Sequence, residues 1–395
     1  MKTIAIDIRP LLEKNWGGVS WFTYYLTDGL TKQAAQGNLR VFLFYNQKAL
    51  LNNSTVRLLK KWRARQNVKI KGYKLPNKIL NLTMRLLNYP RIDDLLMIKH
   101  AFVKSFQLRQ GIDYFILSNL SFIALSDKTK RIAICHDLSF KIFPEFFTVR
   151  QKIWHKMINP REFYRKADKI LAVSQNTKQD LIDLYKIDAD KITVLYPGID
   201  HTRFKIIDNC TAVQNKYHLP DNFILFVGTL EPRKNLETLI EAYDLCESGM
   251  PNLIIAGPEG WKFDRIYRFW IKAKHKPKIR FINQIDDADL PALYNLARIF
   301  VYPSFYEGFG FPPLESMACG TPVIAGHGSS LPEVIGNAGL LIDPFNIADL
   351  AYAMERLLSN QKLYDTLKTK GLEKAGEFRW EKTVNQFLIN LISNF

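Results

Sequence analysis

The sequence is poor in cysteine and has no long hydrophobic run. Its four cysteines lie far apart and outside any CxxC or zinc-type spacing: Cys135, Cys210, Cys246 and Cys319. We therefore expect free thiols in a reducing compartment, without a disulfide framework or a structural zinc site. No uninterrupted apolar run reaches about 18 residues, so a membrane-spanning helix is not expected. The segment after Met1 and Lys2 is too short and interrupted for a secretory signal, and we expect a cytoplasmic protein.

The chain also lacks internal repeats and low-complexity tracts, which excludes solenoid and fibrous architectures. Hydrophobic residues make up 47% of the sequence, as in a globular protein. A length of 395 residues exceeds one ordinary core. We expect an N-terminal domain over residues 1–200, a C-terminal domain over residues 201–379, and a final helix over residues 380–395 that returns to the first domain.

Acidic residues are scarce in the first half. Residues 1–200 carry 34 Lys and Arg against 16 Asp and Glu, whereas residues 201–395 carry 21 against 22. The excess concentrates in residues 48–110, where 15 basic residues accompany two acidic ones and interleave with Trp62, Tyr73 and Phe102. This mixture suits an anionic membrane surface, here the inner face of the plasma membrane, or a solvated basic face. No nucleic-acid-binding motif accompanies it, so we expect no nucleic-acid partner.

Short apolar runs alternate with helix-like stretches along the whole chain, which predicts α/β architecture with parallel sheets. Ser174 is a good N-cap for the helix after the fifth run. Ligands of such folds bind at the carboxyl ends of the strands, here facing a cleft between the two doubly wound domains. The predicted strands are Ile4–Ile8, Val41–Tyr45, Tyr114–Leu117, Ile132–Cys135, Ile170–Val173, Ile192–Leu195, Phe223–Val227, Leu253–Ala256, Ile279–Phe281, Ile299–Val301, Val323–Ala325 and Leu340–Ile342.

The most informative motif is Glu307-Gly-Phe-Gly-Phe-Pro-Pro-Leu-Glu315. Its glycines expose backbone amides, and Pro312-Pro313 opens a helix whose free N–H groups suit a phosphate. The two carboxylates suit vicinal hydroxyls, one pair at each end of a ligand. The motif therefore predicts a site for a molecule with sugar hydroxyls at both ends and phosphate between them, which describes a nucleotide sugar.

A second motif, Val227-Gly-Thr-Leu-Glu-Pro-Arg-Lys-Asn235, follows another strand of the same domain. Arg233 and Lys234 stand at the mouth of the next helix. Two cations beside a helix start form an electrophilic clamp for a diphosphate leaving group.

Three weaker signals complete the picture. Gly17-Gly18 follows the first strand and lets backbone amides approach a ligand closely. His136-Asp137 follows another strand, where the imidazole suits a sugar hydroxyl and Asp137 either orients it or meets an acceptor. The acidic run over residues 286–289 resembles a metal motif, but it precedes a helix and we interpret it as helix capping.

Together these motifs resemble the retaining glycosyltransferases of family 4, in the GT-B structural class of two Rossmann-like domains. The resemblance is dense over about 220–385 and includes residues 378–380, similar to the family's crossover helix. It implies that Glu315 binds the ribose and that Arg233 and Lys234 bind the diphosphate. It also implies that the donor sugar contacts Glu307, the Phe309, Gly310 and Phe311 amides, and His136 from the opposite wall. We expect Gly17, Gly18 and Asp137 to belong to the same donor site. Thr229 departs from the family, where many relatives carry arginine.

The amino-acid sequence of the second motif is most similar to that of bacterial mannosyltransferases of surface polysaccharide synthesis. The resemblance implies transfer of a hexose, with mannose from GDP-mannose as the favoured donor, to a glycan or lipid-linked glycan. Front-face attack with retention is expected, without a metal or other cofactor. Two alternatives stay open: a non-catalytic nucleotide-sugar-binding partner of an assembly complex, and a nucleotide-sugar epimerase on the same architecture.

Overall fold

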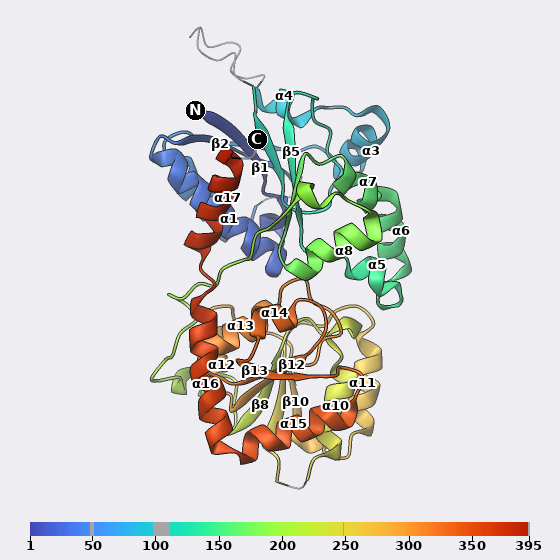
Figure 1. Cartoon of the computed structure of the whole chain (residues 1–395), viewed down its shortest axis with the longest axis vertical. Coiled ribbons are helices and arrows are strands. Elements are labelled where there is room, and N and C mark those ends of the chain that lie inside the picture. Colours follow the sequence, from blue (N-terminus) through green and yellow to red (C-terminus); the bar gives the residue numbers. More distant parts are fainter. Residues whose placement is uncertain (48–50, 98–110, 248, 394–395) are drawn as a thin grey trace.

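Two parallel β-sheets organise the described residues, which are 1–47, 51–97, 111–247 and 249–393 of the computed structural model (Figure 1). The seven strands of the first sheet run in the order β3-β2-β1-β4-β5-β6-β7, and the six of the second in the order β10-β9-β8-β11-β12-β13. Every pairing between these strands is parallel. The two sheets belong to two Rossmann-like domains, so the expected fold class is confirmed.

The central strands of each sheet are almost wholly buried, because helices cover both faces of each sheet, whereas the edge strands are partly exposed. The strands are β1 Lys2–Asp7, β2 Leu39–Asn46, β3 Val68–Tyr73, β4 Tyr114–Leu117, β5 Lys130–Cys135, β6 Lys169–Ala172, β7 Ile192–Val194, β8 Phe223–Val227, β9 Asn252–Ala256, β10 Ile279–Ile282, β11 Ile299–Tyr302, β12 Val323–Gly326 and β13 Gly339–Ile342.

The helices between these strands supply the crossovers of each sheet. In the first domain they are α1 Gly18–Ala35, α2 Asn53–Arg63, α3 Asn77–Leu87, α4 Ile92–Met97, α5 Ser139–Ile142, α6 Val149–Ile158, α7 Pro160–Arg165 and α8 Gln175–Tyr185. After that come α9 Thr211–Lys216, α10 Leu236–Leu245, α11 Phe263–Lys272, α12 Leu290–Leu296, α13 Phe311–Ala318, α14 Leu331–Ile335, α15 Ile347–Ser359, α16 Gln361–Gly376 and α17 Trp380–Ser393.

The last helix returns to the first domain, as expected. Figure 1 shows α17 rising from the end of α16 and lying beside α1. Trp380 stacks on Tyr25 with ring centroids 4.6 Å apart and meets Phe22 edge-on. The two segments that cross between the domains are also joined, because the Ile199 amide donates to the Phe378 carbonyl at 3.1 Å. The C-terminal end of the chain therefore ties both domains together.

The described part of the basic stretch over residues 48–110 contains both helices and a strand. Residues 48–50 and 98–110, with Phe102, lie outside the described residues. The remainder forms α2, the unpredicted strand β3, α3 and α4. Strand β3 was missed because it is a half-exposed edge strand whose lysines interrupt the apolar pattern. Trp62 is fully buried and donates to Asp28 at 2.9 Å, so this aromatic residue belongs to the core.

The structure also bears on membrane-spanning helices and on the cysteines. In the described ranges, no helix is both long and apolar enough to cross a bilayer. All four cysteines are buried and unpaired. Burial also raises the pKa of the Cys246 thiol to about 12, which keeps it protonated at neutral pH.

The packing of α17 on α1 predicts an unusual effect of a glycine-to-alanine change. A Cβ added at Gly29 would lie 2.4 Å from a methyl carbon of Val384. Alanine at a helix interior normally stabilises by about 1 kcal/mol. We expect Gly29→Ala instead to lower the free energy of unfolding by about 1–3 kcal/mol through overpacking, measured by urea denaturation.

Gly376→Ala is the matched control, because a Cβ there meets nothing within 4 Å. The Gly29→Ala loss is expected to shrink in a Val384→Ala background, which isolates the pairwise contact. A fully stable Gly29→Ala protein would contradict this account of the α1–α17 interface.

Candidate active site

The strand order brings the two main motifs to one point. In the second sheet the order reverses between β8 and β11, and a crevice forms where the loops after these two strands diverge. The loop after β8 carries Arg233 and Lys234, and the loop after β11 carries Glu307. The first sheet reverses between β1 and β4, and Gly17-Gly18 follows β1. Arg233, Lys234, Glu307 and the glycine pair therefore lie at the switch points of the two sheets, whereas His136 and Asp137 follow β5.

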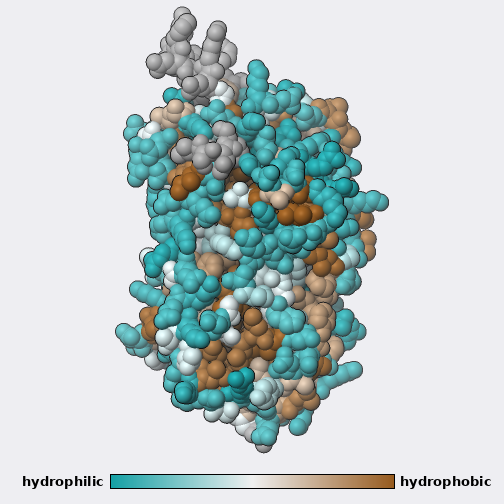
Figure 2. All heavy atoms as spheres, in the orientation of Figure 1, coloured by the Kyte–Doolittle hydropathy of each residue, from teal (hydrophilic) through white to brown (hydrophobic). Residues whose placement is uncertain are grey.

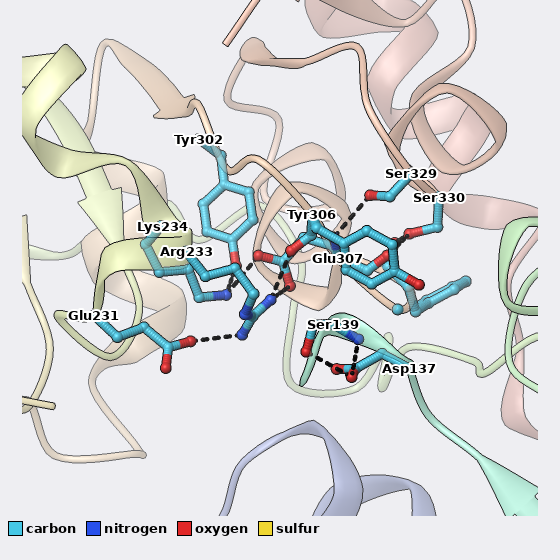
Figure 3. A network of polar contacts seen from close by, with 12 residues as sticks. Asp137, Ser139, Glu231, Arg233, Lys234, Tyr302, Tyr306, Glu307, Ser329 and Ser330 are labelled. Carbon is cyan, nitrogen blue, oxygen red and sulfur yellow. Dashed lines mark hydrogen bonds and ion pairs between the residues drawn. The ribbon is translucent and has the colours of Figure 1, made fainter. Parts of the chain in front are cut away.

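Glu307 forms the centre of a buried ion-pair cluster (Figure 3). Its Oε2 lies 2.8 Å from Arg233 Nη1, and its Oε1 lies 2.7 Å from Lys234 Nζ. Arg233 Nη2 also pairs with Glu231 at 2.6 Å, and Lys234 donates to the Tyr302 hydroxyl. The structure thus brings together the carboxylate of one motif and both cations of the other.

The cluster has a strongly perturbed electrostatic state. Burial alone raises the pKa of the Glu307 carboxyl, but Arg233 and Lys234 outweigh this effect and lower it to about 2. Burial and the neighbouring guanidinium lower the pKa of Lys234 despite its carboxylate partners. Glu307 is therefore a carboxylate at neutral pH and a weak base. With Glu231 included, the two cations face two carboxylates.

The backbone of the Glu307 loop is held by residues that sequence reasoning missed. Ser329 Oγ accepts from the Glu307 amide at 2.7 Å. Ser330 Oγ reaches the carbonyls of Glu307 and Phe309 at 2.9 and 2.8 Å. Both serines lie between β12 and α14 (Figure 3). The signal was present, because Gly328-Ser-Ser-Leu-Pro332 repeats the strand–loop–helix pattern of the main motif.

The Glu307 loop touches the first domain directly. A Cβ at Gly308 would lie 1.8 Å from the His136 carbonyl oxygen, so only glycine permits this approach. Gly310 adopts φ of 106°, a left-handed conformation that favours glycine just before α13. His136 Nε2 lies 2.8 Å from the Ser118 carbonyl, and burial lowers the pKa of this imidazole, which is neutral at pH 7.

Asp137 does not orient His136. Its Oδ1 accepts from the Ser139 amide at 3.0 Å and from the Ser139 hydroxyl at 2.7 Å, within its own loop. Of the two roles considered for this carboxylate, orientation of the imidazole is therefore wrong. Figure 3 shows Asp137 on the first-domain side, facing the Arg233 and Glu307 cluster.

The glycine pair of the first domain faces the aromatic part of the main motif. Gly17 is the N-cap position of α1, and a Cβ there meets nothing within 4 Å. A Cβ at Gly18 would lie 3.1 Å from the Phe311 ring. Phe311 also packs near Phe309 and Trp380, with ring centroids 5.3 and 6.3 Å away. The start of α1 thus meets the start of α13 across the domain boundary.

Glu315 lies apart from the ion-pair cluster, on α13. Its Oε2 accepts from the Tyr294 hydroxyl at 2.9 Å. Burial raises the pKa of the Glu315 carboxyl to about 7, and Tyr294 and Arg203 only partly offset this effect. It lines a small pocket with Arg203 and Trp21 at the junction of the two domains. A larger hollow of about 920 Å³ lies at the opposite ends of the strands and contains none of the predicted site residues.

The acidic residues over 286–289 do not cap the helix that follows them. Asp289 occupies the N-cap position of α12, but its side chain makes no capping bond. Instead Lys216 pairs with Asp286 at 2.5 Å and with Asp289 at 2.6 Å, and Tyr217 donates to Asp289 at 2.9 Å. The capping prediction is wrong because a nearby cation competes for the carboxylates. Among the described residues, no cluster of three or more His, Cys, Asp or Glu is arranged to hold a metal ion.

Comparisons with known proteins assign this geometry to a class. Sucrose-phosphate synthase from Thermosynechococcus elongatus superposes with a TM-score of 0.71 at 19% identity, covering 98% of this chain and 97% of that one. Anabaena Alr3699/HepE, in complex with UDP and glucose, gives 0.71 at 18% identity over the full length of both chains. The fold is therefore that of the two-domain GT-B glycosyltransferases.

Sequence comparison then identifies the family. Residues 16–203 match the family described as Glycosyltransferase Family 4, and residues 212–374 match Glycosyl transferases group 1. The chain belongs to this glycosyltransferase family and is a hexosyltransferase. It is 34% identical over 312 residues to O-antigen chain mannosyltransferase B of Escherichia coli, covering 76% of this chain and 81% of that protein.

A second relative is much longer. Serotype-specific mannosyltransferase WbdA of Escherichia coli is 32% identical over 265 residues, which cover 65% of this chain and 32% of that protein. The matched region is thus about a third of that relative's length.

The buried charge cluster predicts a stability difference that depends on pH. Glu307→Gln removes the carboxylate that compensates Arg233 and Lys234, so we expect a loss of about 3–5 kcal/mol in the free energy of unfolding at pH 7. Because the folded-state pKa of Glu307 lies below its ordinary value, the wild-type advantage is present above about pH 4.5 and declines as pH falls toward 2. Urea denaturation at pH 7 and pH 3 measures how much the difference in the free energy of unfolding between the wild type and Glu307→Gln decreases.

Glu373→Gln on exposed α16 is the control and should leave stability unchanged at both pH values. A gap between wild type and Glu307→Gln that stays constant from pH 7 to pH 3 would contradict the assigned ionisation.

Proposed function

We propose that this glycosyltransferase moves a hexose, with mannose from GDP-mannose as the first candidate, onto a glycan or lipid-linked glycan during surface polysaccharide synthesis. The Glu307–Arg233–Lys234 cluster at the β8–β11 switch point is the observation that carries the proposal. The names of the two Escherichia coli relatives support the choice of mannose and of a polysaccharide product.

In the proposed donor site, Arg233 and Lys234 exchange their partner Glu307 for the diphosphate of the donor. In the structure Glu307 neutralises Arg233 and Lys234. When a nucleotide sugar binds, its diphosphate takes the place of the carboxylate beside the two cations. Glu307 is then free to accept hydrogen bonds from the sugar hydroxyls. This exchange keeps both buried cations compensated before and after binding, and hydrogen bonds from the sugar hydroxyls then solvate the displaced carboxylate.

The other predicted residues frame the two ends of the donor. Glu315 binds the ribose hydroxyls, and the amides of Phe309, Gly310 and Phe311 face the sugar at the start of α13. His136, neutral and held by Ser118, contacts the sugar from the first domain. The amides at Gly17 and Gly18 and the Asp137 carboxylate complete that wall.

The proposed chemistry proceeds with retention by front-face attack. The bond between the anomeric carbon and the leaving phosphate oxygen breaks as the acceptor hydroxyl attacks from the same side. The acceptor proton passes to that phosphate oxygen, so no protein base is required. Arg233 and Lys234 stabilise the charge that develops on the diphosphate, and removing one such cation should cost about 3 kcal/mol in the barrier. Because these side chains act as the electrophile, we propose that no metal is needed.

A donor panel tests the proposal. The protein is incubated separately with GDP-mannose, UDP-glucose, UDP-GlcNAc and dTDP-rhamnose, and thermal shift and slow donor hydrolysis are recorded. We expect a selective shift with GDP-mannose, hydrolysis unchanged by EDTA, and a rate at least 100-fold lower in Glu307→Ala and Arg233→Ala. The Glu373→Gln protein serves as the control.

Other outcomes point elsewhere. Donor binding without transfer to any acceptor indicates the non-catalytic partner, and conversion of the donor sugar without an acceptor indicates an epimerase. Unchanged turnover in Glu307→Ala would overturn the site assignment.

We also propose contact with an anionic membrane through the basic stretch, now narrowed to α3. Three leucines there are 55–70% exposed, Leu82, Leu86 and Leu87, and Tyr89 beyond the helix is 65% exposed. Arg85 on the helix and Arg91 just after it are also exposed. Figure 2 shows apolar side chains at the outer edge of the first domain, on the side where Figure 1 places α3. An exposed apolar and basic face suits anionic lipid headgroups.

Flotation with phosphatidylglycerol-containing vesicles at low salt measures this contact. We expect Leu87→Glu to reduce binding several-fold, because it places a negative charge against the anionic surface. Tyr352→Glu, a similarly exposed apolar position on α15, should bind like the wild type. Absence of vesicle binding by the wild type would remove the membrane proposal and leave the transferase proposal intact.

A further inference from the structure

Glu333 reaches from the second domain into the first. It lies on α14, and its carboxylate accepts hydrogen bonds from three groups of the first domain. Its Oε2 accepts from the Gln175 amide at 2.9 Å and from the Tyr196 hydroxyl at 2.7 Å, and its Oε1 accepts from the Asn176 amide at 3.1 Å. Two of the three donors are the first backbone N–H groups of α8.

These two amides need a partner from outside their own helix. Helix α8 spans Gln175–Tyr185, and its N-cap Ser174 accepts only from the Thr177 amide. The Gln175 and Asn176 amides precede the first intrahelical hydrogen bond, and the positive end of the helix dipole lies beside them. The Glu333 carboxylate accepts hydrogen bonds from both amides and places a negative charge at the positive end of the helix dipole. Because Glu333 belongs to the other domain, it can do this only while the two domains are in contact.

The next turn of α8 contacts the loop that carries Glu307. The Tyr306 hydroxyl donates to Asp180 Oδ2 at 2.5 Å, and the Thr177 hydroxyl lies 3.4 Å from the Gly308 carbonyl. Tyr306 and Gly308 flank Glu307 in the sequence. The start of α8 therefore docks on the Glu307 loop at the same time as it docks on Glu333.

The segment before Glu333 holds the same loop from the other side. Ser329 and Ser330 bind the amide and carbonyl of Glu307, and Glu333 follows Ser330 by three residues. One short segment, residues 329–333, thus binds the backbone of Glu307 through its two serines and binds the first domain through Glu333. A movement between the domains would pull on this segment and on the Glu307 loop together.

We infer that Glu333 is a positioning residue of the transfer reaction, which latches α8 when the domains close and so couples closure to the placement of Glu307. The inference rests on the proposed transferase activity for its kinetic part only. Its structural part, that Glu333 holds the two domains together, stands independently of the reaction.

Glu333→Gln tests the latch, because the amide keeps the size of the side chain but loses the charge and one acceptor. We expect kcat for donor turnover to fall about tenfold or more, equivalent to about 1.4 kcal/mol in the barrier, with nucleotide affinity changed less than about twofold. Small-angle X-ray scattering should show a larger radius of gyration than that of the wild type, with and without added GDP or UDP. Tyr196→Phe removes one of the three hydrogen bonds and should show a smaller effect in the same direction.

Glu373→Gln on α16 is the matched control and should change neither quantity. Unchanged kcat and scattering in Glu333→Gln would overturn the inference. Expanded scattering with unchanged kcat would show a latch that does not position Glu307 and would overturn the coupling. If the wild type turns over no donor, the proposed function fails, and the scattering comparison alone still decides whether Glu333 holds the domains together.

Discussion

The compensation of buried charge at Glu307 is the constraint on which the rest of the site depends. Two cations lie next to each other in the loop after β8, and both are largely buried. Such charges are stable in a protein interior only when a partner of opposite sign is close and the geometry is good. Glu307 supplies that partner from a different strand end. The ion pair therefore draws the loops after β8 and β11 together and orients the groups proposed to meet the donor.

The domain boundary is built to keep this cluster aligned. Gly308 lets the Glu307 loop press on the His136 backbone, and α17 returns to pack its aromatic start on α1. Glu333 adds a charge-assisted contact to the start of α8. The Gly308 and Glu333 contacts join the second domain to the first beside Glu307, although the charge cluster itself belongs to the second domain.

Most strands of the fold could be predicted from the local pattern of apolar residues. Buried parallel strands appear as continuous apolar runs, and twelve such runs correspond to strands of the two sheets. The exception, β3, is an edge strand that alternates with lysine and shows no run. Trp62 illustrates the same limit, because an aromatic residue among basic ones looks exposed until its indole is placed against Asp28. The carboxylates at 286 and 289 were misassigned because their partner, Lys216, lies about 70 residues earlier in the chain.

The class of architecture, the family and the residue types proposed for a nucleotide-sugar site could be predicted from the sequence, because these depend on short motifs and on spacing within one strand–loop–helix unit. Which charges pair with one another depends on the tertiary structure. Glu307 meets Arg233 and Lys234 across more than 70 residues, and Glu333 meets α8 across more than 150. Such contacts arise from strand order and domain packing, which bring distant segments together and leave no periodic trace in the sequence.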